Sequence, residues 1–267
     1  MRYPKGSLQL NQSRDLPLMR QVLHSEFISH SQLFEFAGLN HFEISRKSFD
    51  WRMRRLVEGQ LAIRQTVPGC TGGFVYSVAG NGAAVLQGMG EYCLVGRGKL
   101  NGRDTQQSLF HALELNEIQL SALRAELLVR WISSMEIRSQ NELTRYGFAK
   151  DYDAVVTVRA GAGESRFALE YERSPKPKRY YSGVAADLDQ ELHVSQVLYL
   201  ASNYDLLRFV SSFFRSSRCQ VFFGLVKDWH AQLLDMPVFC NATSRSRRFR
   251  DSLGQTGAPP LSAAVTR

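Results

Sequence analysis

The chain has 267 residues, a formal net charge of +8, and a hydrophobic fraction of 44%. This length allows one large domain or two ordinary ones. The apolar fraction is typical of a globular protein and excludes a chain too polar to bury a core.

The basic surplus is unevenly distributed along the chain. The net charge is +5 over residues 1–100, −1 over residues 101–240 and +4 over residues 241–267. A localised surplus of this kind indicates a polyanionic partner, usually nucleic acid. The alternative interpretation is that the charge only keeps the protein in solution.

Cysteine spacing and apolar runs limit the class of protein further. The four cysteines are far apart and form no CxxC pair, so a zinc ribbon or a thioredoxin motif is not expected. Thiols scattered in this way suit a reducing cytosol. The N-terminus lacks the apolar core of a signal peptide, and no apolar run approaches ~18 residues. We therefore expect a cytoplasmic protein with no membrane partner.

The first part of the chain, residues 12–88, has the pattern of three short helices followed by a β-hairpin. The expected helix limits are Asp15 to about His24, Ser29 or Ser31 to Gly38, and Ile44 or Ser45 to Glu58. The expected strands are Gln60–Thr66 and Phe74–Val78, joined by a glycine-rich tip. This order is typical of a winged helix-turn-helix domain, and a short helix from Gly80 follows it.

The third helix is the candidate recognition helix for double-stranded DNA. Apolar side chains such as Phe49 and Met53 recur at helical spacing on one of its faces. The basic and aromatic residues that we expect to contact DNA, including one from the hairpin, are Arg46, Lys47, Trp51, Arg54, Arg55 and Arg64. The alternatives are an ordinary solvated face and, for Trp51, burial against a neighbouring element.

Residues 88–102 contain five glycines, and we expect a linker over residues 89–104. The next segment, residues 105–240, alternates helical and strand patterns, which predicts an α/β domain with a mixed sheet. Its expected elements are helices over Ser108–Arg130, Lys178–His193 and Tyr204–Phe214, and strands over Trp131–Ile137, Tyr152–Val158, Arg166–Glu172, Val194–Ala201 and Arg218–Val226. Residues 241–267 are predicted to form a disordered basic tail.

Three acidic residues lie on the predicted hairpin of the second domain. Glu170 and Glu172 point to the same face of a strand, and Asp153 can meet them if the two strands pair. Carboxylates that converge in this way are candidate ligands of Mg²⁺ or Mn²⁺. The alternative is that they are solvated acidic residues at the ends of strands.

Several motifs in this order resemble the replication-relaxation family of plasmid and mobile-element proteins. The winged-helix half carries the resemblance in ISRKSFDWRMRRLVEGQLAIRQ and FVYSVAGNGAAVL. It continues in FHALELNEIQLSAL, with His111 and Asn116, in RSQNELTRYG, and in DYDAVVTV and FALEYERS, so that it covers most of residues 15–230. The resemblance implies a DNA-binding winged helix fused to a domain like the PD-(D/E)xK nuclease core, in a protein of plasmid replication, DNA relaxation or mobilisation.

The resemblance also assigns site residues and shows two departures. Asp153 matches the family's aspartate and Glu170 its strand glutamate, which are the catalytic and metal-binding positions. Tyr152 replaces the proline that usually precedes the aspartate. Glu172 stands where an active nuclease of this class has a lysine, so that Lys176 or Lys178 would have to supply the catalytic cation.

Three functions therefore remain open from the sequence. The first is a DNA-binding protein, expected to be a homodimer, whose nuclease-like domain serves as a scaffold. The second is a Mg²⁺-dependent DNA endonuclease that uses Asp153, Glu170 and Glu172. The third is an interaction module that binds other replication or mobilisation proteins.

Overall fold

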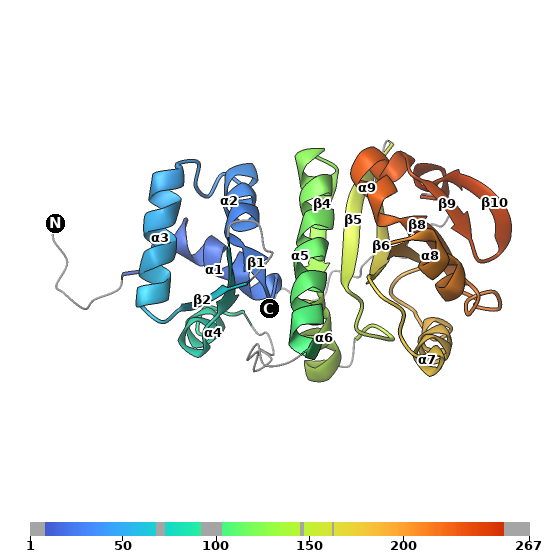
Figure 1. The fold of residues 1–267 in the computed structure, drawn as a ribbon, viewed down its shortest axis with the longest axis horizontal. Helices are drawn as coiled ribbons and strands as arrows, with labels where there is room; N and C mark the ends of the chain where they lie inside the picture. The colour runs from blue at the N-terminus through green and yellow to red at the C-terminus, as the bar shows by residue number, and fades with distance from the viewer. Residues whose placement is uncertain (1–8, 68–72, 92–102, 145–146, 162, 254–267) are drawn as a thin grey trace, which may run out of the picture. The chain divides into compact units, whose positions relative to one another are not determined.

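The computed structural model describes residues 9–67, 73–91, 103–144, 147–161 and 163–253. Its contacts divide the chain into two compact units, each of which we describe by itself (Figure 1). The first unit comprises the described residues up to Arg124 together with Ser133–Leu143. The second comprises Ala125–Ile132 and the described residues from Thr144 onward.

The first unit consists of helices around a small antiparallel sheet with the strand order β1-β3-β2. Its elements are α1 (Asp15–His24), β1 (Ile28–Ser29), α2 (His30–Leu39), α3 (Arg46–Glu58), β2 (Ala62–Thr66), β3 (Phe74–Val78), α4 (Gly80–Gln87), α5 (Arg103–Arg124) and α6 (Ser134–Leu143).

The three predicted N-terminal helices and the hairpin are confirmed, with small differences at their ends. Ser29 caps α2 in a reciprocal pair with Gln32, and α2 continues one residue past Gly38. Asp15 does not cap α1 as expected, because it is the first helical residue and its carboxylate is buried. Strand β1 was not predicted, since two residues are too few to show a period.

Helix α5 belongs to the first unit, although the sequence prediction placed it in the second domain. Asn116 donates a hydrogen bond from Nδ2 to the Phe27 carbonyl at 2.8 Å, and the Gln32 side chain donates to the Leu113 carbonyl at 2.7 Å. Leu120 joins the core built by α1, α2 and α3. Helix α5 is therefore attached to the first unit by hydrogen bonds and by apolar packing.

The prediction for the residues after α5 was wrong. Instead of a helix to Arg130 and a strand over Trp131–Ile137, the chain forms β4 (Leu128–Ser133) and then α6. The Ser133 hydroxyl accepts from the Glu136 amide, and the Glu136 carboxylate accepts from the Ser133 amide. This capping box starts a helix in which Met135 and Ile137 are buried.

The second unit is built on a seven-stranded mixed sheet with the order β10-β9-β8-β7-β6-β5-β4. Strands β6, β7 and β8 are parallel, whereas β5 pairs with β6, β8 with β9, and β9 with β10 in antiparallel register. Its elements after β4 are β5 (Ala154–Ala160), β6 (Gly163–Glu172), α7 (Lys178–Leu188), β7 (Gln196–Ala201), α8 (Tyr204–Ser211), β8 (Gln220–Leu225), α9 (Val226–Gln232), η1 (Leu233–Asp235), β9 (Pro237–Cys240), β10 (Thr243–Arg248) and η2 (Phe249–Ser252).

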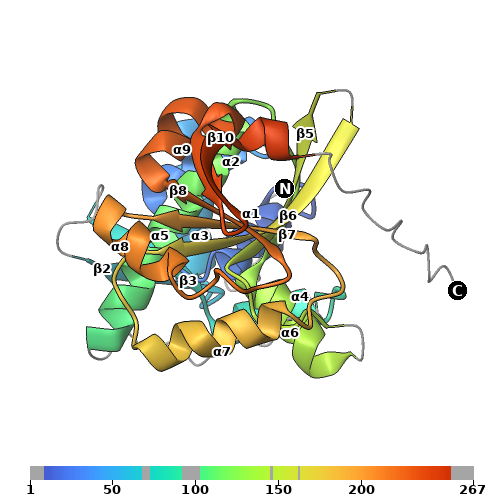
Figure 2. The same ribbon diagram turned by 90° about the vertical axis from the view of Figure 1, so that its right-hand side faces the viewer.

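Helices cover both faces of this sheet, as an α/β layer requires. Helices α7 and α8 lie on one face, and α9 lies on the other (Figure 2). The buried side chains of β7 form an unbroken row, which is typical of a central parallel strand. The predicted α/β architecture, a mixed sheet interleaved with helices, is therefore confirmed.

The prediction of a disordered tail was wrong for residues 243–252. Strand β10 pairs with β9, and Phe249 of η2 is buried against the rings of Phe167 and Phe222. The guanidinium of Arg247 lies 5.2 Å from the Phe222 ring centroid, so the arginine stem covers apolar surface. The prediction of disorder counted the charges of this segment and could not take account of arginine stacking on an aromatic ring.

Some predicted features lie outside the described residues. They are the tip of the hairpin over 68–72, most of the predicted linker, over 92–102, and the final segment, 254–267. Within the described ranges, no helix has the length and apolarity needed to cross a membrane.

Two glycines in α4 allow a matched test of packing. A Cβ at Gly82 would lie 2.0 Å from the Leu61 carbonyl oxygen, whereas a Cβ at Gly80 would meet no atom within 4 Å. We expect Gly82→Ala to lower the free energy of unfolding by about 1–3 kcal/mol through overpacking. Gly80→Ala should leave it unchanged or raise it by up to ~1 kcal/mol. Urea denaturation of both variants measures this difference, and equal values would contradict the close approach at Gly82.

Candidate functional site

Helix α3 carries most of the predicted DNA-binding residues. The Ser45 hydroxyl caps it by accepting from the Ser48 amide, and the chain leaves the helix at Gly59. Its buried residues recur at three- and four-residue spacing and therefore share one face; they are Phe49, Arg52, Met53 and Leu56. The opposite face of the helix is left to solvent.

One cation on the buried face, Arg52, fixes α3 to the rest of the unit. Its Nη1 donates to Asp15 Oδ1 of α1 at 2.9 Å, and its Nε donates to Glu43 Oε2 in the α2–α3 loop at 3.0 Å. All three side chains are buried. Removal of one member of such a cluster leaves an uncompensated buried charge.

Glu43 is held in its charged form by this arrangement. Burial alone would raise the pKa of its carboxyl group, but hydrogen bonds from Ser48, Arg52 and the Ser45 amide lower that pKa to about 2. The Ser48 hydroxyl donates to Glu43 Oε2 at 2.5 Å, so Glu43 also secures the first turn of α3. The helix is thus positioned by ion pairs as well as by apolar packing.

The exposed face of α3 presents four of the predicted contact residues. Arg46, Lys47, Trp51 and Arg54 are all exposed. The Arg46 Nε donates to Asp50 Oδ1 at 3.1 Å, which fixes its direction. Lys47 and Arg54 form no ion pair or side-chain hydrogen bond with any described residue, so both are available to an anionic partner.

Trp51 and Arg55 form a stacked pair beside this face. The Arg55 guanidinium lies 4.5 Å from the Trp51 ring centroid and donates to the Gln9 carbonyl at 2.8 Å. Trp51 remains 48% exposed. Arg55 is therefore committed to contacts within the protein, and its effect is to orient the exposed indole ring.

A groove of about 470 Å³ separates α3 from the β2–β3 hairpin, and Arg54 and Arg64 both line it. His30 lies within it, with Nε2 2.9 Å from Asp50 Oδ1 and Nδ1 2.9 Å from the Tyr76 hydroxyl. Burial, followed by the charge of Arg46, lowers the pKa of His30. The neutral ring then donates to Asp50 and accepts from Tyr76.

The predicted acidic residues of the second unit lie close together but are not free. Asp153 precedes β5, and its Oδ2 accepts from the Tyr171 amide of β6 at 2.7 Å. Glu170 and Glu172 point to one face of β6 and are both buried. Burial raises the pKa of Glu170 to about 7, and the adjacent Lys150 ammonium acts in the opposite direction.

Each of the two buried glutamates contacts a lysine. Lys150 donates from Nζ to Glu170 Oε1, and Lys176 donates from Nζ to Glu172 Oε1 at 2.8 Å. Burial lowers the pKa of Lys176, but the Glu172 carboxylate more than reverses this and raises it. Lys178, the other predicted cation, is exposed at the start of α7 and forms no ion pair with the described residues.

This arrangement does not fit a divalent metal. Its predicted ligands are Asp153 and Glu170, with Glu172 as the third carboxylate. The ammonium groups of Lys150 and Lys176 already neutralise the two glutamates. Among the described residues, no group of three or more His, Cys, Asp or Glu side chains is placed to hold a metal ion. A Mg²⁺ or Mn²⁺ ion would require both lysines to move away.

Sequence reasoning missed Arg52 and Lys150. Arg52 had a usable signal, because it lies three residues after Phe49 and four before Leu56, on the apolar face of the helix. Lys150 had none beyond its place three residues before Asp153. Its contact with Glu170 depends on how the segment before β5 folds over β6, which spacing does not reveal.

Comparison of the chain with protein-family models, with curated proteins and with solved structures finds no match.

The role of Arg52 can be tested against Arg54, which stands two residues away on the exposed side. We expect Arg52→Ala to lower the free energy of unfolding by about 3–5 kcal/mol, because Asp15 and Glu43 remain buried without their partner. Arg54→Ala should change it by no more than about 0.5 kcal/mol. Guanidinium chloride denaturation compares the two variants. Similar losses in both would show that Arg52 does not anchor the helix.

Proposed function

We propose that this protein binds double-stranded DNA through α3 and the β2–β3 hairpin. The observation that carries this proposal is that Lys47 and Arg54 have no ion-pair partner among the described residues, on a helix whose opposite face is anchored in the core. Arg64, exposed on β2, adds a third cation across the groove. Cations without internal partners on a rigid element are suited to phosphate contacts.

The order α1-β1-α2-α3-β2-β3 supports a winged helix-turn-helix, in which α3 is the recognition helix and the hairpin is the wing. We assign Lys47, Arg54 and Arg64 to the DNA backbone. Arg46, whose direction Asp50 fixes, is the candidate for a base edge. Trp51, oriented by Arg55, would contact the sugar-phosphate surface beside it.

For the second unit we propose a scaffold related to the PD-(D/E)xK nuclease core. Within this unit the strands and helix β4, β5, β6, α7 and β7 follow one another, with α6 of the first unit inserted between β4 and β5. Asp153 before β5 and Glu170 on β6 support the assignment. The two lysine–glutamate pairs favour a domain that does not cleave DNA. It would serve dimerisation or contacts with replication or mobilisation proteins, as the resemblance to the replication-relaxation family implies for a cytoplasmic protein of a plasmid, phage or other mobile element.

A metal-dependent endonuclease is the second candidate function. The observation that favours it is Lys150, which contacts Glu170 and thereby supplies a cation that the family pattern places at position 172. Because the acidic residues as arranged do not fit a metal, we rank this function below DNA binding alone.

The DNA interface predicts a change in salt dependence. The double variant Lys47→Ala/Arg54→Ala should lower the slope of log binding constant against log salt concentration by roughly two, since two phosphate contacts are lost. Fluorescence anisotropy with a labelled duplex at several salt concentrations measures the slope. Lys178→Ala/Arg179→Ala removes two exposed cations of α7 and serves as a charge-matched control. An equal effect in the control would count against α3 as the contact surface.

Cleavage is tested separately on supercoiled plasmid with Mg²⁺, with Mn²⁺ and with EDTA. We expect the wild-type protein to bind the plasmid without nicking it, because Lys150 and Lys176 neutralise the acidic residues. Asp153→Ala and Glu170→Ala should then bind as the wild type does. Metal-dependent nicking that both variants abolish would replace the scaffold proposal with the endonuclease.

A further inference from the structure

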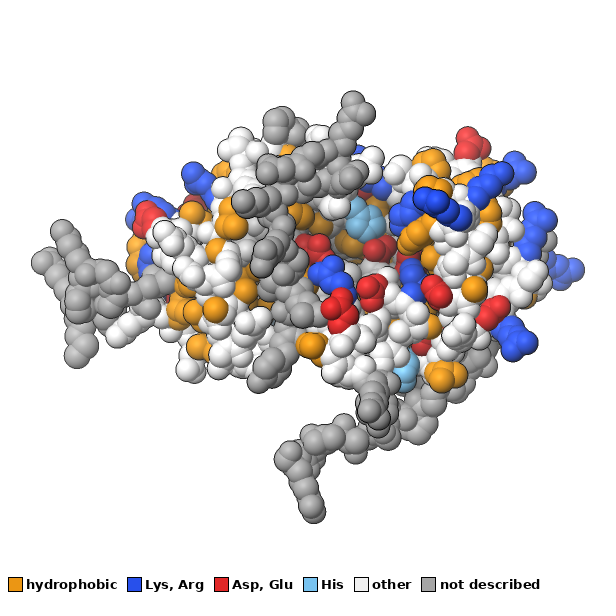
Figure 3. Space-filling view, turned by 90° about the horizontal axis from the view of Figure 1, so that it is seen from below, with side chains coloured by type: hydrophobic (Ala, Val, Ile, Leu, Met, Phe, Trp, Pro, Cys, Tyr) orange, Lys and Arg blue, Asp and Glu red, His pale blue; other side chains and the backbone are white. Residues whose placement is uncertain are grey.

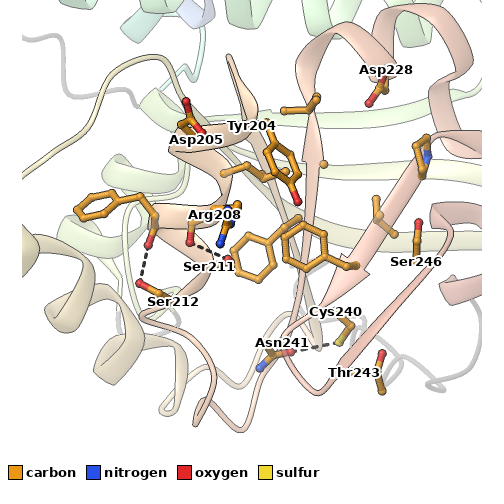
Figure 4. Close-up of a pocket in the computed structure, with 18 of the residues that line it drawn as sticks. Tyr204, Asp205, Arg208, Ser211, Ser212, Asp228, Cys240, Asn241, Thr243 and Ser246 are labelled. Atoms are coloured by element: carbon orange, nitrogen blue, oxygen red, sulfur yellow. Dashed lines mark hydrogen bonds between the residues drawn. The ribbon is translucent and has the colours of Figure 1, made fainter.

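The second unit contains a pocket of about 820 Å³ between α8 and the ends of β8, β9 and β10 (Figure 4). Two of its lining residues, Phe223 and Phe239, share a sheet face with Glu170, because Glu170, Tyr199, Phe223 and Phe239 stand in register on four neighbouring strands. Asp228 of α9 lines the pocket as well. None of the proposed DNA contacts lines it.

Aromatic rings form the floor and one wall of this pocket. Phe223 and Phe239 stack across β8 and β9, with their ring centroids 5.3 Å apart and an interplanar angle of 25°. Tyr204, at the start of α8, is 59% exposed and directs its ring toward the pocket (Figure 4). Phe223 itself is fully buried, so the aromatic surface open to a ligand is that of Tyr204 and the half-buried Phe239. Such surface can stack on a flat ring.

The pocket also presents polar groups that have no partner in the described ranges. Tyr204, Arg208, Arg215, Thr243 and Ser246 all line it, and none of their side chains forms a hydrogen bond or ion pair with a described residue. Two of them are guanidinium groups, which bind phosphate oxygens in a forked geometry. Lys and Arg side chains also project from the outer part of this unit (Figure 3).

The charges in the pocket are separated along its length. Asp205 and Asp228 lie toward the upper end in Figure 4, and Arg208 lies below them beside Ser211. Within the described part of the chain, neither carboxylate forms an ion pair. The pocket therefore offers carboxylate acceptors, a guanidinium group on α8 at Arg208 and another after that helix at Arg215, and the aromatic surface of Tyr204 and Phe239.

We infer that this pocket binds a nucleoside phosphate, with its phosphate at Arg208 and Arg215 and its base stacked on Phe239 and Tyr204. An exocyclic amino group of the base would donate to Asp205 or Asp228. Free phosphate would leave the aromatic floor unused, and an apolar ligand would leave both guanidinium groups unpaired. The ligand is either a free nucleotide or one residue of a single-stranded nucleic acid, and this inference does not depend on duplex binding by α3.

Isothermal titration calorimetry with the full-length protein tests the inference. The ligands are adenosine 5′-monophosphate, adenosine and inorganic phosphate, and we expect the first to bind more tightly than the other two. Arg208→Ala and Arg215→Ala should each weaken the binding of adenosine 5′-monophosphate by about tenfold or more, since each removes a charged hydrogen bond. Phe239→Leu should weaken adenosine 5′-monophosphate and adenosine alike.

Two control variants make the result specific to the pocket. Arg218→Ala removes an exposed cation from the loop before β8 that does not line the pocket, and it should leave binding unchanged. Lys47→Ala/Arg54→Ala should impair duplex binding only. A labelled oligodeoxyadenylate distinguishes a free nucleotide from a residue of a single strand. If it binds more tightly than the mononucleotide, the natural ligand of the pocket is a single-stranded nucleic acid. Absence of binding by all of these probes, or binding that Arg208→Ala and Arg215→Ala leave unchanged, would overturn the inference.

Discussion

The buried contacts of Arg52 with Asp15 and Glu43 determine how the first unit presents its charge. Helix α3 carries five basic side chains, and one of them, Arg52, is buried. That residue ties the helix to α1 and to the preceding loop, and the orientation of every exposed residue on α3 follows from this attachment. Arg55 adds a second, weaker tie through Trp51 and the Gln9 carbonyl. Some cations of α3, such as Arg52 and Arg55, therefore hold the helix in place, whereas others, such as Lys47 and Arg54, are exposed to solvent.

The second unit also pairs buried carboxylates with basic side chains. Glu170 and Glu172 are buried on β6 and are compensated by Lys150 and Lys176, as Asp15 and Glu43 are compensated by Arg52. A buried carboxylate without a cation is costly, and each of these lysines supplies the opposite charge. The Tyr199 hydroxyl nearby is buried without a hydrogen-bond partner in the described chain. This cluster is therefore one of internally paired charges rather than of free carboxylates.

Local signals predicted the elements whose ends and faces are encoded in neighbouring residues. Ser45 and Gly59 marked α3, and the β-branched run before the glycine turn marked β5 and its partner β6. The errors arose where contacts between distant segments decide the structure. Strand β10 forms because Arg247 and Phe249 pack on residues far earlier in the chain, and Lys150 reaches Glu170 only after β5 and β6 have paired. The sequence could identify the acidic residues but could not show that lysines neutralise them.

The position of α6 has a consequence for the inheritance of this protein. Helix α6 supplies Met135 to the core of the first unit, while β4 before it and β5 after it belong to the sheet of the second. Neither unit is thus one continuous stretch of chain, and no single cut separates them intact. A gene fragment encoding either unit alone would lack a piece of it or carry a piece of the other. The two units are therefore expected to pass between genomes together and to diverge together.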